Sequence, residues 1–187
     1  MPLRLLLVRH GLSSFNKERR IQGRDDLSNL SDEGHEQARA LGRSLQEVSF
    51  QAIYSSPLQR AAATTASLLE AHAGQAPDVV LDDGLLEVDL EPWSGQTIDE
   101  LIEGSPEAYS IWKQQPMRLE LQRRDGSSYK PLAELMEQAR GFITNLLQRH
   151  PVDGNDTVLV VAHNAILRCL MLVLLGEPDN GFRRLCV

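Results

Sequence analysis

Short apolar runs alternate along the chain with longer segments in which apolar residues recur every three or four positions. The runs at 5–8, 52–54, 79–81 and 157–162 are too short for helices, and each predicts a β-strand, buried in the case of 5–8. The periodic segments between them predict helices. Strands separated by helices are typical of a mostly parallel sheet, so the pattern predicts an α/β fold with three layers, α/β/α.

Four segments carry the helical period most clearly. Ser31 is the predicted N-cap of the first helix. Ser56-Pro57 supplies a capping serine and a first-turn proline for the second, which extends to Leu69. The period returns at 132–147 and at 164–175. These helices are expected to cover the predicted sheet.

Residues 84–130 show a weaker pattern. Glycine and proline residues divide them into two predicted helices, at 97–103 and 105–115. The segment 123–128 is predicted to be a flexible loop. The chain contains no internal repeat or low-complexity linker, so we expect 1–187 to form a single domain.

Composition limits the classes of function. With 187 residues, of which 42% are hydrophobic and 24% charged, the chain resembles an ordinary soluble domain. No apolar run approaches the ~20 residues that cross a bilayer, and the first strand begins too early to leave room for a signal peptide. We therefore expect no membrane partner. The two cysteines are too few for a disulfide framework, which favours a cytoplasmic location.

The formal net charge of −7 argues against nucleic acid as a partner. A basic run at 17–24 is an exception, and two interpretations stay open: a solvated surface loop, or a segment that attracts anions toward His10. The chain has no CxxC or HExxH pattern, so we predict no metal site and no cofactor. The sequence leaves the oligomeric state open, with a homodimer as one possibility.

Candidate chemistry lies at the ends of two predicted strands. Arg9-His10-Gly11 follows the first strand directly, and His163 follows the last. Because α/β sheets gather ligand sites at the carboxyl ends of their strands, we expect the two histidines to share one site. Arg60 lies in the predicted first turn of the second helix, where free N–H groups and a guanidinium suit a phosphate group.

Four ordered motifs extend this picture. They are Arg9-His10-Gly11 with Asn16, Gln22-Gly23-Arg24 and Leu30-Ser31-Asp32-Glu33-Gly34; Tyr54-Ser55-Ser56-Pro57-Leu58-Gln59-Arg60-Ala61 with Thr65-Ala66; Leu86-Glu87 with Trp93-Ser94-Gly95; and Val160-Val161-Ala162-His163. In this order they resemble the histidine phosphatase superfamily, which includes the cofactor-dependent phosphoglycerate mutases. The chain looks most like the phosphatase branch. The resemblance implies a phosphoglycerate mutase-like fold.

The resemblance also implies roles for five residues. His10 would attack phosphorus and form a phosphohistidine, and its other ring N–H would need an acceptor that fixes the tautomer. Arg9, Arg60 and His163 would surround the phosphoryl oxygens and stabilise their charge. Glu87 would protonate the leaving oxygen and then activate water, a task that needs a pKa raised by burial or apolar neighbours.

Four further residues match positions near the family's ligand. Asn16 falls where the family binds phosphate, and Gln22 and Gly23 fall where it contacts substrate. Asn164 replaces the glycine that usually follows the last histidine, so its side chain is expected close to the phosphate pocket.

The other histidines and the internal cysteine have ordinary interpretations. His35, His72 and His150 fall on polar faces or at helix ends, and we expect them to be solvated. Cys169 is expected to be a small core residue of the last helix.

Three departures from the family pattern leave the substrate open. Leu12 follows the first motif, where an acidic or amide residue is usual. The family's Gly-Glu-Ser stretch is absent, and 126–130 occupies that region. The sequence stops at Val187, where the family generally continues into a further strand, which a truncation or membership of a longer protein would explain.

The leading hypothesis is a metal-independent phosphatase acting on a small phosphorylated metabolite. One alternative is a cofactor-dependent phosphoglycerate mutase. Mutases of this family have a longer segment before the last histidine, rich in basic groups. Here Arg118, Arg123 and Arg124 are its only arginines before the long helix, which favours the phosphatase. A second alternative is a phosphate-binding or interaction module without turnover. The sequence does not choose among sugar phosphates, phosphoglycerates, carboxyarabinitol phosphate and phosphoserine.

Overall fold

The computed structural model describes residues 2–187, and its central sheet has four strands in the order β1-β6-β2-β3. Every neighbouring pair is parallel, as the alternating pattern predicts. The register places Arg9 beside Ala162 and Ser55 beside Val161, so three strands end close together at one edge of the sheet. The strands are β1 (Arg4–Arg9), β2 (Ala52–Ser55), β3 (Val79–Leu81) and β6 (Thr157–Ala162).

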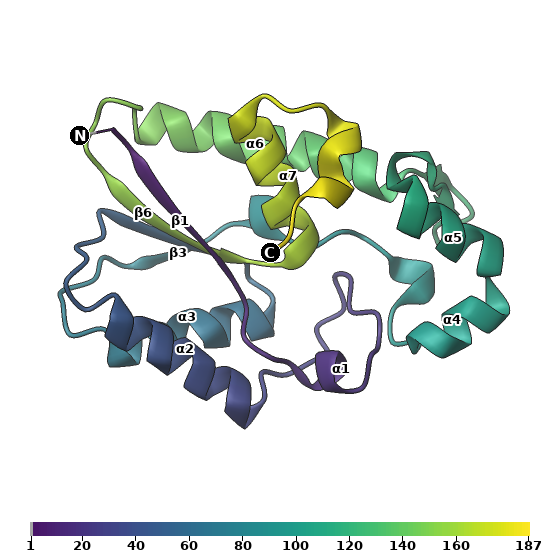
Figure 1. The fold of residues 1–187 in the computed structure, drawn as a ribbon, viewed down its shortest axis with the longest axis horizontal. Helices are drawn as coiled ribbons and strands as arrows, with labels where there is room; N and C mark the ends of the chain where they lie inside the picture. Colours follow the sequence, from purple (N-terminus) through teal and green to yellow (C-terminus); the bar gives the residue numbers. More distant parts are fainter. Residues whose placement is uncertain (1) are drawn as a thin grey trace.

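Helices cover both faces of this sheet and give the predicted three layers (Figure 1). One pair, α2 with α3, lies on one face, and α6 with α7 lies on the other (Figure 1). The helices of the two layers are α2 (Asp32–Ser44), α3 (Gln59–Ala71), α6 (Pro131–Arg149) and α7 (Asn164–Leu175).

The central strand β6 joins two apolar cores, because successive side chains of a strand point to opposite faces. Val158 and Val160 belong to the core that includes α6 and α7. Leu159 and Val161 belong to the core that includes Ile53 and the α2–α3 layer. All six residues of β6 are buried, whereas edge strand β1 is only partly covered. The rigid centre of the sheet therefore supports the segment that leads into His163.

Short elements occupy the regions where the sequence pattern is weak. The two helices expected between 97 and 115 are confirmed as α4 and α5. The loop predicted at 123–128 is the turn of a small antiparallel hairpin, except that Ser128 begins the second strand. Backbone pairing between the two short strands orders it. The short elements are α1 (Ser14–Lys17), η1 (Asp83–Leu85), η2 (Glu91–Trp93), α4 (Ile98–Gly104), α5 (Pro106–Gln114), η3 (Pro116–Arg118), β4 (Leu121–Gln122), β5 (Ser128–Tyr129) and η4 (Asp179–Arg184).

One predicted helix start is correct and the other is wrong. Ser31 caps α2, with its Oγ accepting from the Gly34 N–H at 3.1 Å. Ser56 does not cap α3, which begins at Gln59 after an N-cap without a side-chain hydrogen bond. The Ser56 hydroxyl lies instead 2.8 Å from a ring nitrogen of His163. A long-range partner thus replaces the local capping contact.

The expectation that the remaining histidines are solvated is wrong. His72 is only 6% exposed, and the others also have partners inside the fold. The pairs are His35 with Ser67 at 2.8 Å, His72 with the Val48 carbonyl at 2.9 Å and His150 with Asp156 at 2.6 Å. Each ring folds back onto a neighbouring element, which helix position alone does not reveal. Cys169 is fully buried in α7, as predicted.

No helix within residues 2–187 combines the length and apolar character needed to cross a bilayer.

Candidate active site

His10 lies just beyond β1, with its main chain still attached to the sheet through an N–H bond to the Ala162 carbonyl at 2.9 Å. Its ring Nδ1 is 2.8 Å from the Gly11 carbonyl oxygen. Because a carbonyl only accepts, Nδ1 carries the proton and Nε2 keeps its lone pair. The acceptor that the nucleophile hypothesis requires is therefore present.

The environment of His10 also keeps the ring neutral. Its side chain is almost fully buried. Burial is the main cause that lowers the pKa of His10 to about 4, and the positive charges of Arg60 and Arg9 act in the same direction. The hydrogen bond to Gly11 opposes them but does not prevail. At neutral pH the Nε2 lone pair is thus free to act as a nucleophile.

His163 lies directly beside His10, with 5.1 Å between the ring centroids. It is fully buried, and its Nε2 is 2.8 Å from the Ser56 hydroxyl. Its Nδ1 has no hydrogen-bond partner among residues 2–187. Burial and the neighbouring Arg60 hold the pKa of His163 well below its usual range. One ring nitrogen is therefore paired with Ser56, and the other is buried without a partner.

Arg60 is the second residue of α3 and is 1% exposed. Its guanidinium donates to the carbonyls of Gly23 at 2.8 Å and Asp25 at 2.9 Å. These contacts fix the orientation of the group, while Nε has no partner among the described residues. Burial lowers the pKa of Arg60 and Glu87 is the foremost of the carboxylates that raise it, yet an arginine stays charged at neutral pH.

Two glycines allow the loop after β1 to pack against its surroundings. A Cβ at Gly11 would stand 2.6 Å from the Gly34 carbonyl oxygen at the start of α2, so this approach excludes any side chain. Gly23 has φ +52°, a left-handed conformation that favours glycine, and its carbonyl accepts from Arg60. Gly11 and Gly23 therefore allow the backbone conformation that positions His10 and Arg60.

Glu87 points its carboxylate at the N-terminus of α7. Oε1 accepts from the N–H groups of Val88 at 2.9 Å, Ala165 at 3.1 Å and Ile166 at 3.2 Å. These donors favour the ionised form, but desolvation by burial outweighs them and raises the pKa of Glu87. A carboxyl with a raised pKa is suited to give up a proton and take it back.

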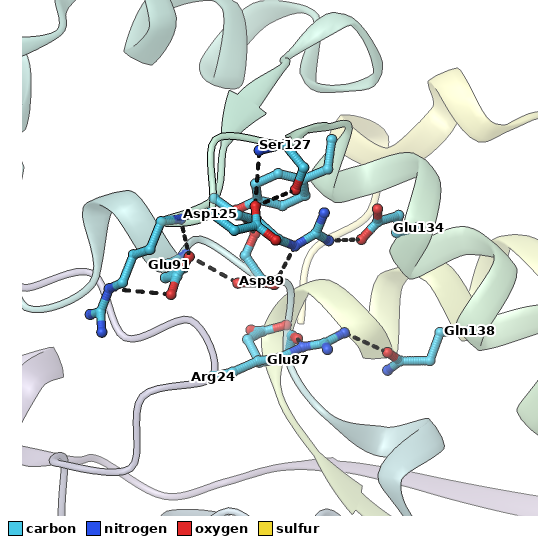
Figure 2. Close-up of polar contacts among 11 residues, drawn as sticks. Arg24, Glu87, Asp89, Glu91, Asp125, Ser127, Glu134 and Gln138 are labelled. Atoms are coloured by element: carbon cyan, nitrogen blue, oxygen red, sulfur yellow. Dashed lines mark hydrogen bonds and ion pairs between the residues drawn. The ribbon is translucent and has the colours of Figure 1, made fainter.

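A side-chain clamp holds the main chain on both sides of Glu87. Gln138 of α6 donates to the carbonyls of Gly84 at 3.1 Å and Leu86 at 2.8 Å. Arg24 donates to the Glu87 carbonyl at 3.0 Å and to Gln138 Oε1 at 2.7 Å. Figure 2 shows Arg24 and Gln138 meeting beside Glu87, next to the hairpin that carries Asp125 and Ser127. This clamp sets where the Glu87 carboxylate lies.

These groups form the inner end of a cavity of about 350 Å³. His163 lies beneath its surface, in contact with the ring of His10. We call His10, Arg60, Glu87 and His163 the catalytic floor. The predicted residues that line the cavity are Arg9, His10, Gln22, Gly23, Arg60, Glu87 and Asn164.

Besides His163, Asn16 is the predicted site residue that does not line the cavity. Its Oδ1 accepts from the Ser13 hydroxyl at 2.9 Å and from the Ser13 N–H at 3.4 Å, which closes a capping box on α1. The same hydroxyl lies 2.9 Å from the side-chain oxygen of Gln22. Asn16 therefore supports the loop that carries Gln22, and its contact with phosphate stays a prediction.

The sequence analysis missed the opposite end of the cavity. The side chains there come from α5, α7 and η4, and no motif joins these segments. Arginine and tryptophan at those positions look like ordinary surface or core residues in the sequence, so no local signal marks them. We call this group the cationic wall: Trp112, Lys113, Arg168, Phe182 and Arg183.

Within residues 2–187, no group of three or more histidine, cysteine, aspartate or glutamate side chains is arranged to hold a metal ion.

Similar proteins include curated relatives and solved structures with the same fold. The chain is 35% identical to phosphoserine phosphatase 1 of Hydrogenobacter thermophilus, over 96% of this chain and 80% of that protein. It is 33% identical to a probable 2-carboxy-D-arabinitol-1-phosphatase of Arabidopsis thaliana, over 97% of this chain but only 35% of that longer protein.

Among solved structures, a mycobacterial glucosyl-3-phosphoglycerate phosphatase in complex with VO3 superimposes with a TM-score of 0.83. It is 28% identical in sequence, and the match covers 98% of this chain and 87% of that one. The family model of the histidine phosphatase superfamily, branch 1, matches residues 5–187. His10, Arg60 and Glu87 line one cavity and His163 lies beneath His10, so the sequence and the fold agree: this chain belongs to the histidine phosphatase superfamily.

Proposed function

We propose that this protein hydrolyses a small phosphomonoester without a metal ion, through a phosphohistidine formed on His10. Family membership and the relatives named as phosphatases make the chain a phosphoric monoester hydrolase. The observation that carries the mechanism is the His10 ring, which presents an unprotonated Nε2 beside His163 and Arg60.

In the first step, the Nε2 lone pair of His10 attacks phosphorus and the bond from phosphorus to the ester oxygen breaks. Arg9 and Arg60, which line the cavity, neutralise the phosphoryl oxygens, and a contact from His163, which lies beneath the cavity surface against the His10 ring, stays a prediction. The protonated form of Glu87, which burial favours by raising the pKa of the carboxyl, gives its proton to the departing oxygen, which leaves as an alcohol.

In the second step, the Glu87 carboxylate takes a proton from a water molecule as the water oxygen attacks phosphorus. The bond from His10 Nε2 to phosphorus breaks, and inorganic phosphate is released. His10 returns to its neutral tautomer, held by the Gly11 carbonyl, and Glu87 is again protonated. The two steps restore the protein completely.

The test uses p-nitrophenyl phosphate in the presence of a chelator. We expect turnover by the wild type and a loss of at least about 10³-fold in kcat for His10→Ala, because the variant lacks the nucleophile. Acid-labile phosphate on the wild-type chain, trapped by rapid quenching into alkali and absent from the variant, would identify the intermediate. Equal turnover by both proteins would reject His10 as nucleophile, and a requirement for added metal would reject the metal-independent mechanism.

A further inference from the structure

The cavity holds far more positive than negative charge. Arginine and lysine contribute six of the side chains that line it, whereas Glu87 is the single carboxylate among its described lining residues. The protein as a whole has a formal net charge of −7. A positively lined cavity in a negatively charged protein focuses the electrostatic potential on one place and selects anionic ligands. A single phosphoryl group on the catalytic floor occupies only Arg9 and Arg60.

Of the four remaining cations, Arg20 pairs with Glu18, whereas the three on the cationic wall lack acidic partners. Within residues 2–187, no carboxylate lies within salt-bridge distance of Lys113, Arg168 or Arg183. The Nε atoms of Arg168 and Arg183 are buried and have no hydrogen-bond partner in the described part of the chain. Buried unpaired donors are costly, and an anionic ligand is one group that can satisfy donors that line a cavity.

Aromatic rings hold the two guanidiniums close together. The Arg183 guanidinium carbon lies 5.0 Å from the centre of the Trp112 ring and 5.3 Å from that of Phe182. The guanidinium carbon of Arg168, on α7, lies 5.4 Å from the centre of the Phe182 ring. Arg183 also donates to the Trp112 carbonyl. Burial and then the nearby Arg168 lower the pKa of Arg183, which reflects repulsion between the two positive charges. An anion placed between them relieves that repulsion.

We propose that the cationic wall binds a second anionic group of the substrate, a carboxylate or a second phosphate, while the first phosphate lies on the catalytic floor. This inference rests on the proposed phosphatase function and narrows its substrate class. Arg168 and Arg183 supply the planar donors that suit either anion, and Lys113 adds a mobile charge at the rim. A monophosphate without a second anionic group would leave these donors unpaired and bind more weakly.

Matched substrate pairs test the proposal. The first pair is 3-phosphoglycerate and glycerol 3-phosphate, which differ by a carboxylate. The second pair is fructose 1,6-bisphosphate and fructose 6-phosphate, which differ by a phosphate. We expect phosphate release with kcat/KM at least about tenfold higher for the doubly anionic member of one pair, which also tells a carboxylate from a second phosphate.

Three variants locate the effect. Arg183→Gln, Arg168→Gln and Lys113→Gln should each reduce the preference for the doubly anionic substrate, by about tenfold for the arginines and less for the exposed lysine. Because Lys113 is exposed, its variant is expected to fold even if an arginine variant does not. Arg43→Gln, on the exposed face of α2, is the matched control and should leave the preference unchanged.

The outcomes separate this inference from the proposed function. If the protein hydrolyses p-nitrophenyl phosphate but has equal kcat/KM for both members of each pair, the phosphatase function is supported and the second anion site is rejected. An unchanged preference in all folded wall variants has the same meaning. A protein that releases no phosphate from any substrate refutes the proposed function itself, and isomerisation of 3-phosphoglycerate without phosphate release indicates a mutase.

Discussion

The two ends of the cavity hold their charged groups in different ways. On the catalytic floor, main-chain groups fix His10, Arg60 and Glu87. On the cationic wall, Arg168 and Arg183 stand mainly against aromatic rings, and one main-chain bond, from Arg183 to the Trp112 carbonyl, is added. A hydrogen bond to the main chain sets a direction and a distance, whereas an aromatic face tolerates sliding. The floor is therefore suited to one invariant phosphoryl group, and the wall to the part of the substrate that varies.

The largest effect that separates the two ends is expected for Glu87→Gln. The amide keeps the shape but neither donates a proton to the leaving oxygen nor takes one from water, so steady-state kcat should fall by about 10²–10⁴-fold. With p-nitrophenyl phosphate, whose leaving group needs little protonation, we expect a burst of one p-nitrophenolate per chain followed by slow turnover. A stopped-flow trace without a burst would contradict the role of Glu87 in the second step.

The pH dependence of stability should come from the floor rather than from the wall, whose arginines do not titrate near neutrality. The unfolded chain protonates His10 near pH 6.5, whereas the folded protein does so only near pH 4. Between these values the unfolded state binds more protons, so stability falls as the pH falls. A shift of this size corresponds to about 3 kcal/mol of unfolding free energy.

Urea unfolding from pH 7 down to pH 4 checks this expectation. The wild type should lose about 3 kcal/mol more than His10→Gln, which keeps a hydrogen-bonding side chain but has no proton to gain. Lys113→Gln, on the wall, is the control and should follow the wild type. Parallel curves for wild type and His10→Gln would show that His10 is not the buried titrating group described above.

A smaller effect is expected for the clamp behind Glu87. Gln138→Leu removes both donors to the main chain at Gly84 and Leu86 while it keeps the apolar bulk, so kcat should fall by about tenfold with little change in KM. The neighbouring exposed position supplies the control variant Glu137→Gln. A positioning role also predicts a shifted basic limb of the pH–rate profile, which a purely structural defect would not produce. An unchanged limb with full activity would remove Gln138 from the mechanism.

The sequence pattern was most informative where structure is local. The branched runs fix all four strands of the sheet within one or two residues, and the motif histidines follow the strands that end at one edge. It was least informative where the hydrogen-bond partner of a side chain lies far away in the sequence. Ser56 serves His163 rather than α3, and the three histidines expected in solvent are paired with other elements. Long-range contacts of this kind leave no periodic trace in the sequence.

The sequence by itself located His10, Arg60 and His163, because they follow strand ends or begin a helix whose positions come from the local hydrophobic pattern, whereas Glu87 was identified only through the resemblance of the motifs. Only the tertiary structure decided the cationic wall, since α5, α7 and η4 meet there through packing between segments far apart in the chain. It also decided the protonation of the floor, because the low pKa of His10 and the raised pKa of Glu87 both arise from burial. Desolvation is a property of the assembled fold, and no stretch of sequence carries it alone.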